Sequence, residues 1–297
     1  SNPKVEVKGN DPYCAFFTSG TTGLPKGAPV SNKTFLLATE SYLGLPVTKE
    51  DRSYTCLPLF HANAQVYTMM GTRCLGASFV LSDRFSPKKF FKEIIDNNAT
   101  YFNFIGGMLQ ILDAALKPED VPDHGARLAF GAPVPREGWE EKFKIDDIFE
   151  GYGLSEAPVL LGNFDPDKSK RKRGSFGVQM FPDMGRWAKV VDDDGREVGP
   201  GEIGEMVEKG ADFVSEGYWG ASEATKEAID ENGWFHTGDL VRKDEDGYHY
   251  YVDRKKFMIR RAGENIATGE VEAAVNSHPA IETSAAIPAP DPLREEE

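Results

Sequence analysis

The chain has 297 residues, and 40% of them are hydrophobic, which is enough to bury a large core. Its 34 basic and 48 acidic side chains give a formal net charge of −14. The long-range field therefore repels nucleic acid and anionic membrane surfaces, and a polyanionic ligand requires a local cationic pocket.

Other general features concern location and redox state. No stretch approaches the roughly 20 consecutive apolar residues of a membrane span, so we expect no membrane-spanning helix. Cys14, Cys56 and Cys74 are an odd number of cysteines without metal-ligand spacing, which predicts buried, reduced thiols in a cytoplasmic protein. The sequence begins without methionine or a signal peptide, and we interpret it as a piece of a longer protein.

From residue 13 to residue 150, short β-rich runs alternate with helical patterns. This alternation predicts a mostly parallel sheet with flanking helices. Ser86 and Pro87 supply an N-cap and a first-turn proline for the clearest of the helices. The predicted strands are 13–18, 77–81 and 101–104, and the predicted helices are 33–43, 87–97 and 108–116.

From residue 187 onward the pattern changes to strands and turns, which predicts antiparallel hairpins at 187–191, 203–207 and 248–252. The predicted fold class is therefore α/β, with a mostly parallel sheet and flanking helices, followed by a β-rich antiparallel subdomain. The charged run at 168–173 is interpreted as a solvated loop in preference to a binding site.

The strongest local signal for function is a turn rich in glycine and hydroxyl groups, directly after the apolar strand predicted at 13–18. Glycines allow a tight turn that brings N–H groups close to an anion, hydroxyls donate further hydrogen bonds, and Lys26 adds a positive charge for phosphate. The spacing differs from that of a P-loop, which disfavours a P-loop kinase or GTPase. The alternative is a flexible surface turn. The predicted polyphosphate site comprises Thr18, Ser19, Gly20, Thr21, Thr22, Gly23 and Lys26.

This turn resembles the signature loop of the acyl-adenylate-forming superfamily, which includes acyl-CoA synthetases, peptide-synthetase adenylation domains and beetle luciferases. The resemblance is strongest to acyl-CoA synthetases of the crotonobetaine/carnitine-CoA ligase type. It implies ATP, Mg²⁺ and coenzyme A as cofactors and a small carboxylic acid as substrate, whereas the net charge predicts no nucleic-acid partner. Further matching segments follow in order at 58–65, 131–133, 151–156, 217–219, 234–239 and 253–256.

The resemblance implies a nucleotide site. Tyr152 would stack near adenine, with Gly151 and Gly153 leaving room for the base. Glu156 would bind Mg²⁺, which prefers carboxylate and phosphate oxygens, and Ser155 would keep the phosphate contact that threonine makes in most relatives. Without the resemblance, Tyr152 is interpreted as a core side chain and Glu156 as a surface charge. The same nucleotide site would include Gly131, Ala132 and Pro133.

A second group of residues would bind the ribose and the acyl group. Asp239 would accept hydrogen bonds from the ribose hydroxyls, and Arg254 would donate toward ribose and phosphate. His61 would stand between the carboxylate site and the thiol tunnel, although a lone histidine more often has a packing role. Lys256 matches the hinge position, and Gly263 aligns with a glycine of the thiol tunnel. The residues expected to be catalytic are Lys26, His61, Glu156 and Lys256.

The implied reaction has two steps. A carboxylate attacks the α-phosphorus of ATP and expels pyrophosphate, and a thiol then attacks the mixed anhydride. Positioning and charge neutralisation supply most of the acceleration in such substitutions. The acid itself is not specified, because Gly106, Gly107 and Met108 are equally plausible as pocket and as core residues.

We expect three regions: an α/β nucleotide- and acyl-binding subdomain at 1–185, without the first subdomain of the family, a β-rich subdomain at 186–253, and a hinge with the truncated start of a small α+β C-terminal domain at 254–297. The lysine that relatives carry near their C-terminus has no counterpart after Ala280, so reduced activity is expected for this chain alone. Two alternatives stay open: an adenylation domain that feeds a carrier-protein thiol, and a non-catalytic nucleotide-binding module.

Overall fold

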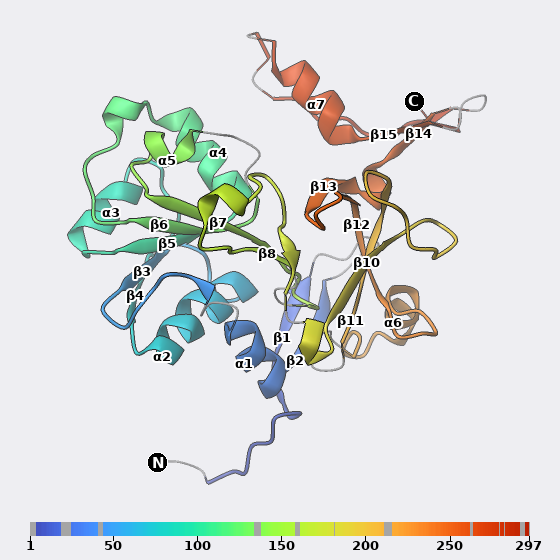
Figure 1. The fold of residues 1–297 in the computed structure, drawn as a ribbon, viewed down its shortest axis with the longest axis horizontal. Coiled ribbons are helices and arrows are strands. Elements are labelled where there is room, and N and C mark those ends of the chain that lie inside the picture. The colour runs from blue at the N-terminus through green and yellow to red at the C-terminus, as the bar shows by residue number, and fades with distance from the viewer. Residues whose placement is uncertain are drawn as a thin grey trace.

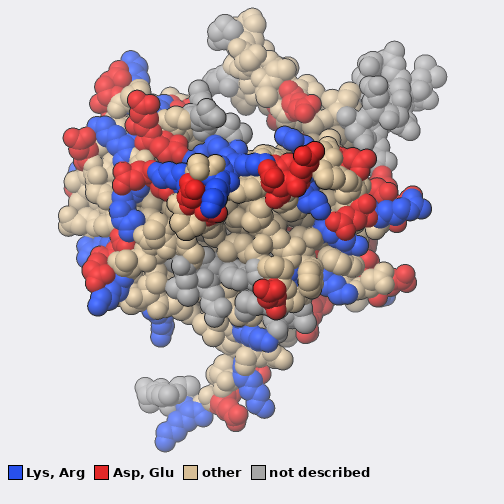
Figure 2. Space-filling view, in the orientation of Figure 1, with Lys and Arg blue, Asp and Glu red and all other residues tan. Residues whose placement is uncertain are grey.

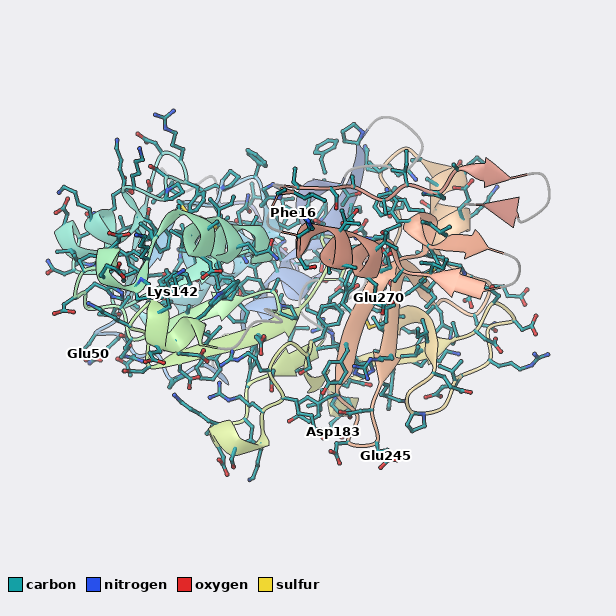
Figure 3. All side chains as sticks on the ribbon, turned by 90° about the horizontal axis from the view of Figure 1, so that it is seen from above. Phe16, Glu50, Lys142, Asp183, Glu245 and Glu270 are labelled. Atoms are coloured by element: carbon teal, nitrogen blue, oxygen red, sulfur yellow. The ribbon has the colours of Figure 1, made fainter. Side chains whose placement is uncertain are left out.

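The computed structural model shows an α/β part and a β-rich part that lie side by side (Figure 1). Lys142 lies in the first part and Glu245 in the second (Figure 3). No helix of the described residues is long and apolar enough to cross a membrane. The structure describes residues 4–18, 25–40, 44–133, 138–157, 161–180, 182–210, 216–261, 264–278, 280–281, 283–291 and 295–296.

A seven-stranded sheet forms the centre of the α/β part, in the order β4-β3-β5-β6-β7-β8-β9. The strands from β4 to β7 are parallel, and β8 and β9 continue the sheet in the antiparallel direction. The predicted α/β fold with a mostly parallel sheet is therefore confirmed. The strands are β3 (Arg52–Thr55), β4 (Ser78–Leu81), β5 (Tyr101–Phe104), β6 (Leu128–Gly131), β7 (Asp147–Tyr152), β8 (Leu161–Asn163) and β9 (Val178–Gln179).

Helices cover both faces of this sheet, because its central strands are apolar on both sides. Along β5, Tyr101 packs in one buried cluster and Phe102 in another, and Leu128 and Ala129 alternate in the same way along β6. Helices α3 to α5 pack on the Phe102 face, and α1, η2 and α2 on the Tyr101 face. The helices are α1 (Asn32–Glu40), the π-helical η2 (Asn63–Met70), α2 (Gly71–Leu75), α3 (Phe90–Asp96), α4 (Gly106–Ala115) and α5 (Trp139–Lys142).

The strand predicted at 13–18 forms as β1 (Pro12–Thr18), but it does not join the parallel sheet. It pairs antiparallel with β2 (Lys26–Ser31), a strand that the sequence analysis missed. Phe16 is buried, whereas Phe17 is 70% exposed. The apolar strand is therefore buried on one side only, because a two-stranded hairpin turns one face to the core and the other to solvent.

A four-stranded antiparallel sheet, in the order β10-β11-β12-β13, confirms the predicted β-rich region. It shares a small apolar cluster with the α/β part, in which Tyr152 packs with Met206 and Val241. The elements are β10 (Trp187–Val191), β11 (Ile203–Lys209), α6 (Ser222–Ala228), β12 (Phe235–Lys243) and β13 (His249–Arg254).

A further four-stranded sheet and α7 (Thr268–Asn276) form the C-terminal segment. The backbone N–H and the hydroxyl of Thr268 both donate to Oδ2 of Asp253, at 2.6 and 2.8 Å, which fixes the start of α7 to β13. The strands are β14 (Ile259–Arg261), β15 (Glu264–Ile266), β16 (Pro290–Asp291) and β17 (Glu295–Glu296). Short 3₁₀ turns occur at η3 (Pro118–Asp120), η4 (Lys168–Lys170), η5 (Pro182–Met184) and η6 (Lys255–Phe257).

The charged run at 168–173 forms ion pairs with both parts of the molecule. Arg171 donates to both carboxylate oxygens of Asp147 at 2.8 Å, and Nζ of Lys172 lies 2.7 Å from Asp244. The interpretation as a solvated loop is therefore wrong for Arg171, whose side chain is 7% exposed, whereas Lys172 remains partly exposed. Asp147 begins β7 and Asp244 follows β12, so the run connects the two sheets. Figure 2 shows basic and acidic side chains interleaved on the face drawn.

The three cysteines are free thiols. Burial raises the pKa of Cys56 to about 12 and that of the half-buried Cys14 to about 11. Cys74 is exposed, so the prediction of buried thiols is wrong for this residue. The reason is local: within the short helix α2 the buried residues are Gly71 and Thr72 of its first turn.

Candidate functional site

The residues expected to bind adenine lie at one edge of the seven-stranded sheet. Parallel neighbours present their carboxyl ends at the same edge, so Gly131 at the end of β6 and Tyr152 at the end of β7 come close together. A cavity of about 340 Å³ opens there. It is lined by Leu57, Pro58, His61, Ala62, Asn63, Tyr67, Ile105, Phe130, Gly131, Ala132, Gly151, Tyr152, Gly153, Leu154 and Ser155. Pro133 directly follows two of these lining residues along the chain.

Close packing of β5 and β6 explains the glycine at the cavity edge. A Cβ atom on Gly131 would lie 2.3 Å from the backbone oxygen of Phe104, a distance that no side chain tolerates. The neighbouring strand would have to move to make room. Gly151 is less restricted, since its Cβ would lie 3.3 Å from the backbone oxygen of Leu161. The glycine at the end of β6 is thus required by the sheet itself.

The two ends of the predicted phosphate loop face each other across the β1–β2 hairpin. Thr18 pairs with Lys26 in the register of the two strands, and its hydroxyl donates to the carbonyl oxygen of Lys26 at 3.5 Å. The two ends of the loop are therefore held together by the pairing of β1 with β2. Its members Ser19, Gly20, Thr21, Thr22 and Gly23 lie outside the described residues.

Tyr152, Asp239 and Arg254 form a hydrogen-bonded group between the two sheets. The hydroxyl of Tyr152 donates to Oδ2 of Asp239 at 2.6 Å, and Nε of Arg254 lies 2.8 Å from Oδ1. Arg254 also donates to the carbonyl oxygen of Thr237 at 2.9 Å, which fixes its guanidinium. Each carboxylate oxygen has a second lone pair, so Asp239 can still accept from a diol.

Burial controls the protonation of this group. It raises the pKa of the Tyr152 hydroxyl well above its usual value, so this group is a hydrogen-bond donor. Burial also raises the pKa of Asp239, and the Arg254 guanidinium opposes that change. The ring of Tyr152 lies 4.4 Å from that of Phe176, so the tyrosine belongs both to the core and to the cavity wall.

Glu156 is 8% exposed and is held by a residue that the sequence analysis had not assigned a role. The hydroxyl of Tyr218 donates to its Oε1 at 2.8 Å. Nζ of Lys26 lies 5.2 Å from the centroid of the same tyrosine ring. The structure thus brings together Glu156 and Lys26, which are separated by more than a hundred positions, through one side chain.

Glu156 suits a Mg²⁺ ion that is shared with a bound polyphosphate. Among the described residues, no group of three or more His, Cys, Asp or Glu side chains could hold a metal ion. Mg²⁺ commonly uses one or two carboxylates and completes its coordination with phosphate oxygens and water. Tyr218 occupies Oε1 of Glu156, and within the part of the chain that the structure describes Oε2 accepts no hydrogen bond. The donor set therefore fits Mg²⁺ together with a nucleotide, and not a metal bound by protein alone.

The remaining predicted residues lie at the cavity wall, in η6 or outside the described part of the chain. His61 is exposed, lines the cavity and packs against Phe60 with ring centroids 4.8 Å apart. Lys256 is exposed in η6, with Nζ 4.5 Å from the ring centroid of Phe257. Gly263 lies outside the described residues. Of the suggested acyl contacts, Met108 is a core residue, and the cavity wall includes its neighbour Ile105 instead.

Glu208 is another residue to which the sequence analysis had assigned no role. It lies in β11 between Ala188 and Phe235, is fully buried, and within the described residues neither of its carboxylate oxygens has a hydrogen-bond partner. Burial raises its pKa to about 8; Arg186 opposes this shift, and Asp239 and Glu156 add to it. In the sequence it stands in a strand with other charges, and nothing distinguishes it from an exposed glutamate.

Comparisons with known proteins were consistent with this geometry. The AMP-binding enzyme family matches residues 1–219. Crotonobetaine/carnitine–CoA ligase of Proteus mirabilis is 32% identical over 288 residues, which cover 94% of this chain and 54% of the ligase. 2-Succinylbenzoate–CoA ligase of Geobacillus kaustophilus is 36% identical over 270 residues, covering 90% of this chain and 54% of that protein.

Solved structures show the same fold. ATP-bound MatB from Rhodopseudomonas palustris superposes with a TM-score of 0.83 at 26% identity, over 98% of this chain and 58% of MatB. O-succinylbenzoate coenzyme A synthetase (MenE) from Bacillus subtilis, in complex with ATP and a magnesium ion, gives a TM-score of 0.82 at 29% identity, over 98% of this chain and 60% of MenE. The chain spans a little over half the length of the relatives it matches.

Proposed function

The chain belongs to the AMP-binding enzyme family, and from this premise we propose that it serves the ATP-dependent ligation of a small carboxylic acid to coenzyme A. Two sets of contacts support the proposal: Tyr218 links Lys26 to Glu156, and Tyr152 at the cavity wall donates to Asp239, which Arg254 also holds. These are the groups needed to hold a triphosphate, a metal ion and a ribose.

In the first step, an oxygen of the substrate carboxylate bonds to the α-phosphorus of ATP, and the bond from that phosphorus to the bridging oxygen breaks to release pyrophosphate. Lys26 would hold the phosphates and neutralise charge as pyrophosphate departs. Asp239 would accept from the ribose hydroxyls while Arg254 fixes its carboxylate. Glu156 would hold Mg²⁺, which supplies charge neutralisation when bound.

In the second step, the thiolate sulfur of coenzyme A bonds to the acyl carbon, and AMP leaves with the electrons of the broken acyl–oxygen bond. His61 at the cavity wall would separate the acid from the approaching thiol. Lys256 would serve the hinge, and Gly263 would line the thiol channel. Free coenzyme A is favoured over a carrier protein because the relatives described above are CoA ligases.

The same proposal assigns 1–185 to nucleotide and acyl binding, 186–253 to a β-rich subdomain, and 254–297 to a hinge and the start of a C-terminal domain. The thiols and the acidic surface suit a cytoplasmic location. Gly131, Ala132, Pro133, Gly151, Gly153 and Ser155 would complete the nucleotide pocket.

The test is hydroxamate trapping of acyl-adenylates by the full-length protein across a panel of carboxylic acids, with coenzyme A consumption measured in parallel. At least one acid should give ATP-dependent hydroxamate, and addition of coenzyme A should divert the acyl group to a thioester. ATP turnover without any trapped acyl group would contradict the proposal. Trapping without coenzyme A consumption would show that the acceptor is another thiol.

A variant ties the reaction to the phosphate site. Lys26→Ala should slow acid-dependent ATP–pyrophosphate exchange by roughly 10²–10³-fold, the cost of losing one well-placed charged donor. Lys49→Ala, which removes an exposed lysine whose Nζ lies 3.8 Å from Glu50, is the matched control. Equal exchange rates in the two variants would refute the assignment of Lys26.

A further inference from the structure

Tyr218 contacts both the carboxylate assigned to the metal and the lysine assigned to phosphate, although it lies on neither of their segments. Its hydroxyl donates to Oε1 of Glu156 at 2.8 Å, and its ring centroid lies 5.2 Å from Nζ of Lys26. One side chain therefore acts on two groups with different tasks. The hydroxyl orients an anion, and the ring face attracts a cation.

Two hydrogen bonds and a close approach at Gly217 fix the backbone around Tyr218. Its own N–H donates to the hydroxyl of Thr225 at 2.9 Å, and the next N–H, that of Trp219, donates to the carbonyl oxygen of Gly27 at 2.8 Å. Gly217 has a φ of +125°, and a Cβ atom there would lie 2.3 Å from Thr225, so only glycine allows this approach. The segment thus joins α6 to the strand that follows the phosphate loop.

Glu156 is buried near other carboxyl groups. Both Glu156 and Asp239 act electrostatically on the buried Glu208, which places three carboxyl groups in one neighbourhood. A hydrogen bond to one carboxylate oxygen restricts the orientation of this side chain. Tyr218 supplies the donor on one oxygen, and the other oxygen stays available to a metal ion.

We propose that Tyr218 is a positioning residue, which holds Glu156 and Lys26 in the one arrangement that binds Mg²⁺ and the phosphates of ATP together. The inference rests on the proposed function, since it assumes that Glu156 and Lys26 serve a nucleotide. A purely structural tyrosine would only join the segment at 217–221 to the hairpin. The two roles differ in one measurable respect, the Mg²⁺ dependence of ATP binding.

The experiment is calorimetric titration of ATP into the full-length protein at a series of Mg²⁺ concentrations. Tyr218→Phe keeps the ring and removes the hydroxyl, so it should raise the Mg²⁺ concentration for half-maximal ATP binding roughly tenfold while leaving Mg²⁺-free binding unchanged. Tyr218→Leu removes the ring as well and should also weaken Mg²⁺-free binding by roughly 2- to 10-fold.

Tyr54→Phe is the matched control, because the Tyr54 hydroxyl also donates to a glutamate, Glu93, at 2.8 Å, but within the α/β core. Its Mg²⁺ midpoint should equal that of the wild type. A Tyr218→Phe midpoint identical to the wild type would overturn the positioning role while leaving the proposed function in place. A wild-type protein whose ATP binding ignores Mg²⁺ would overturn both.

Discussion

The hydroxyl of Tyr152 donates a 2.6 Å hydrogen bond to Oδ2 of Asp239, which joins the end of β7 in one sheet to β12 in the other. Arg254 holds the second oxygen of the same carboxylate at 2.8 Å. These contacts fix the position of Tyr152, proposed to bind adenine, relative to Asp239 and Arg254, proposed to bind ribose. The position of the two sheets therefore depends on a buried polar contact as well as on the apolar cluster around Met206.

Removing this contact should lower stability. Tyr152→Phe leaves a buried carboxylate with one donor fewer, and we expect the free energy of unfolding to fall by about 1.5–3 kcal/mol in urea denaturation. Combined with Asp239→Asn, the loss should be smaller than the sum of the two single losses. Tyr250→Phe, which breaks a 3.2 Å bond to Asp244 near the surface, should cost about 0.5 kcal/mol or less. Strict additivity of the Tyr152 and Asp239 variants would contradict the coupling.

Two glycine substitutions separate close packing from ordinary helix propensity. Gly131→Ala places a Cβ atom 2.3 Å from a backbone oxygen of β5, and we expect a loss of about 3 kcal/mol or more in the free energy of unfolding. Gly107→Ala in α4 meets no atom within 4 Å and should be neutral or stabilising by up to about 1 kcal/mol. Thermal unfolding of both variants tests this. Equal melting temperatures would show that β6 moves to accommodate the added Cβ atom, which would contradict the prediction.

Glu208 predicts a pH dependence of stability. Burial raises its pKa from an ordinary 4.5 to about 8, so between these values the folded chain holds a proton that the unfolded chain releases. Stability therefore falls as the pH rises from the lower value to the higher, and levels off above it. Glu208→Gln removes this term, so its melting temperature should decline less between about pH 6 and about pH 8.

The effect of Glu208 on the melting temperature should be large enough to measure. In a protein of this size each kcal/mol corresponds to roughly 2–4 °C of melting temperature, which calorimetry resolves easily. Glu231→Gln, at an exposed position, should follow the wild type at every pH. If the Glu208→Gln and wild-type curves ran parallel, the carboxyl would be ionised throughout the range.

The thiols should differ in reactivity. Cys74 is exposed, whereas burial holds the pKa of Cys56 near 12 and that of Cys14 near 11, so these two are almost entirely protonated near neutral pH. A maleimide at neutral pH should therefore label one thiol rapidly, as followed by mass spectrometry. Cys74→Ser should abolish the rapid phase and Cys56→Ser should leave it intact. Rapid labelling that survives in Cys74→Ser would contradict the burial pattern.

The sequence predicts two strands of the seven-stranded sheet, the buried interior strand β5 and the mostly exposed edge strand β4, and misses the interior strands β3, β6 and β7. The strand at 101–104 forms with the predicted bounds, and the strand at 77–81 differs by one residue. Helix α3 begins at Phe90 and not at residue 87, with Lys89 as N-cap and no capping side chain. Ser86 contributes instead through its carbonyl oxygen, which accepts the N–H groups of Lys89 and Phe90. Capping chemistry in the sequence thus located the helix but not its first turn.

For the proposed site, the sequence identified individual residues but not the contacts between them. Motifs located Lys26, Glu156, Tyr152, Asp239 and Arg254 because each stands beside glycines or in a short recognisable segment. Contacts between distant positions carry no such mark. Tyr218 meets Glu156 across 62 positions, and β2 pairs with β1 after a loop that hides it as a strand. Long-range pairing depends on the path of the whole chain, which local patterns do not encode.

Two separate parts of the chain form the walls of the cavity. One wall is made by the ends of β6 and β7, and the opposite wall by residues 61–67 at the π-helical η2. Within the described residues, η2 makes no hydrogen bond to Asp239, Arg254 or Glu156. Changes along η2 can therefore reshape the cavity without altering the hydrogen bonds of Asp239, Arg254 and Glu156. Under the proposed function, such changes would alter which acids are accepted and would leave the residues proposed to bind ATP in place.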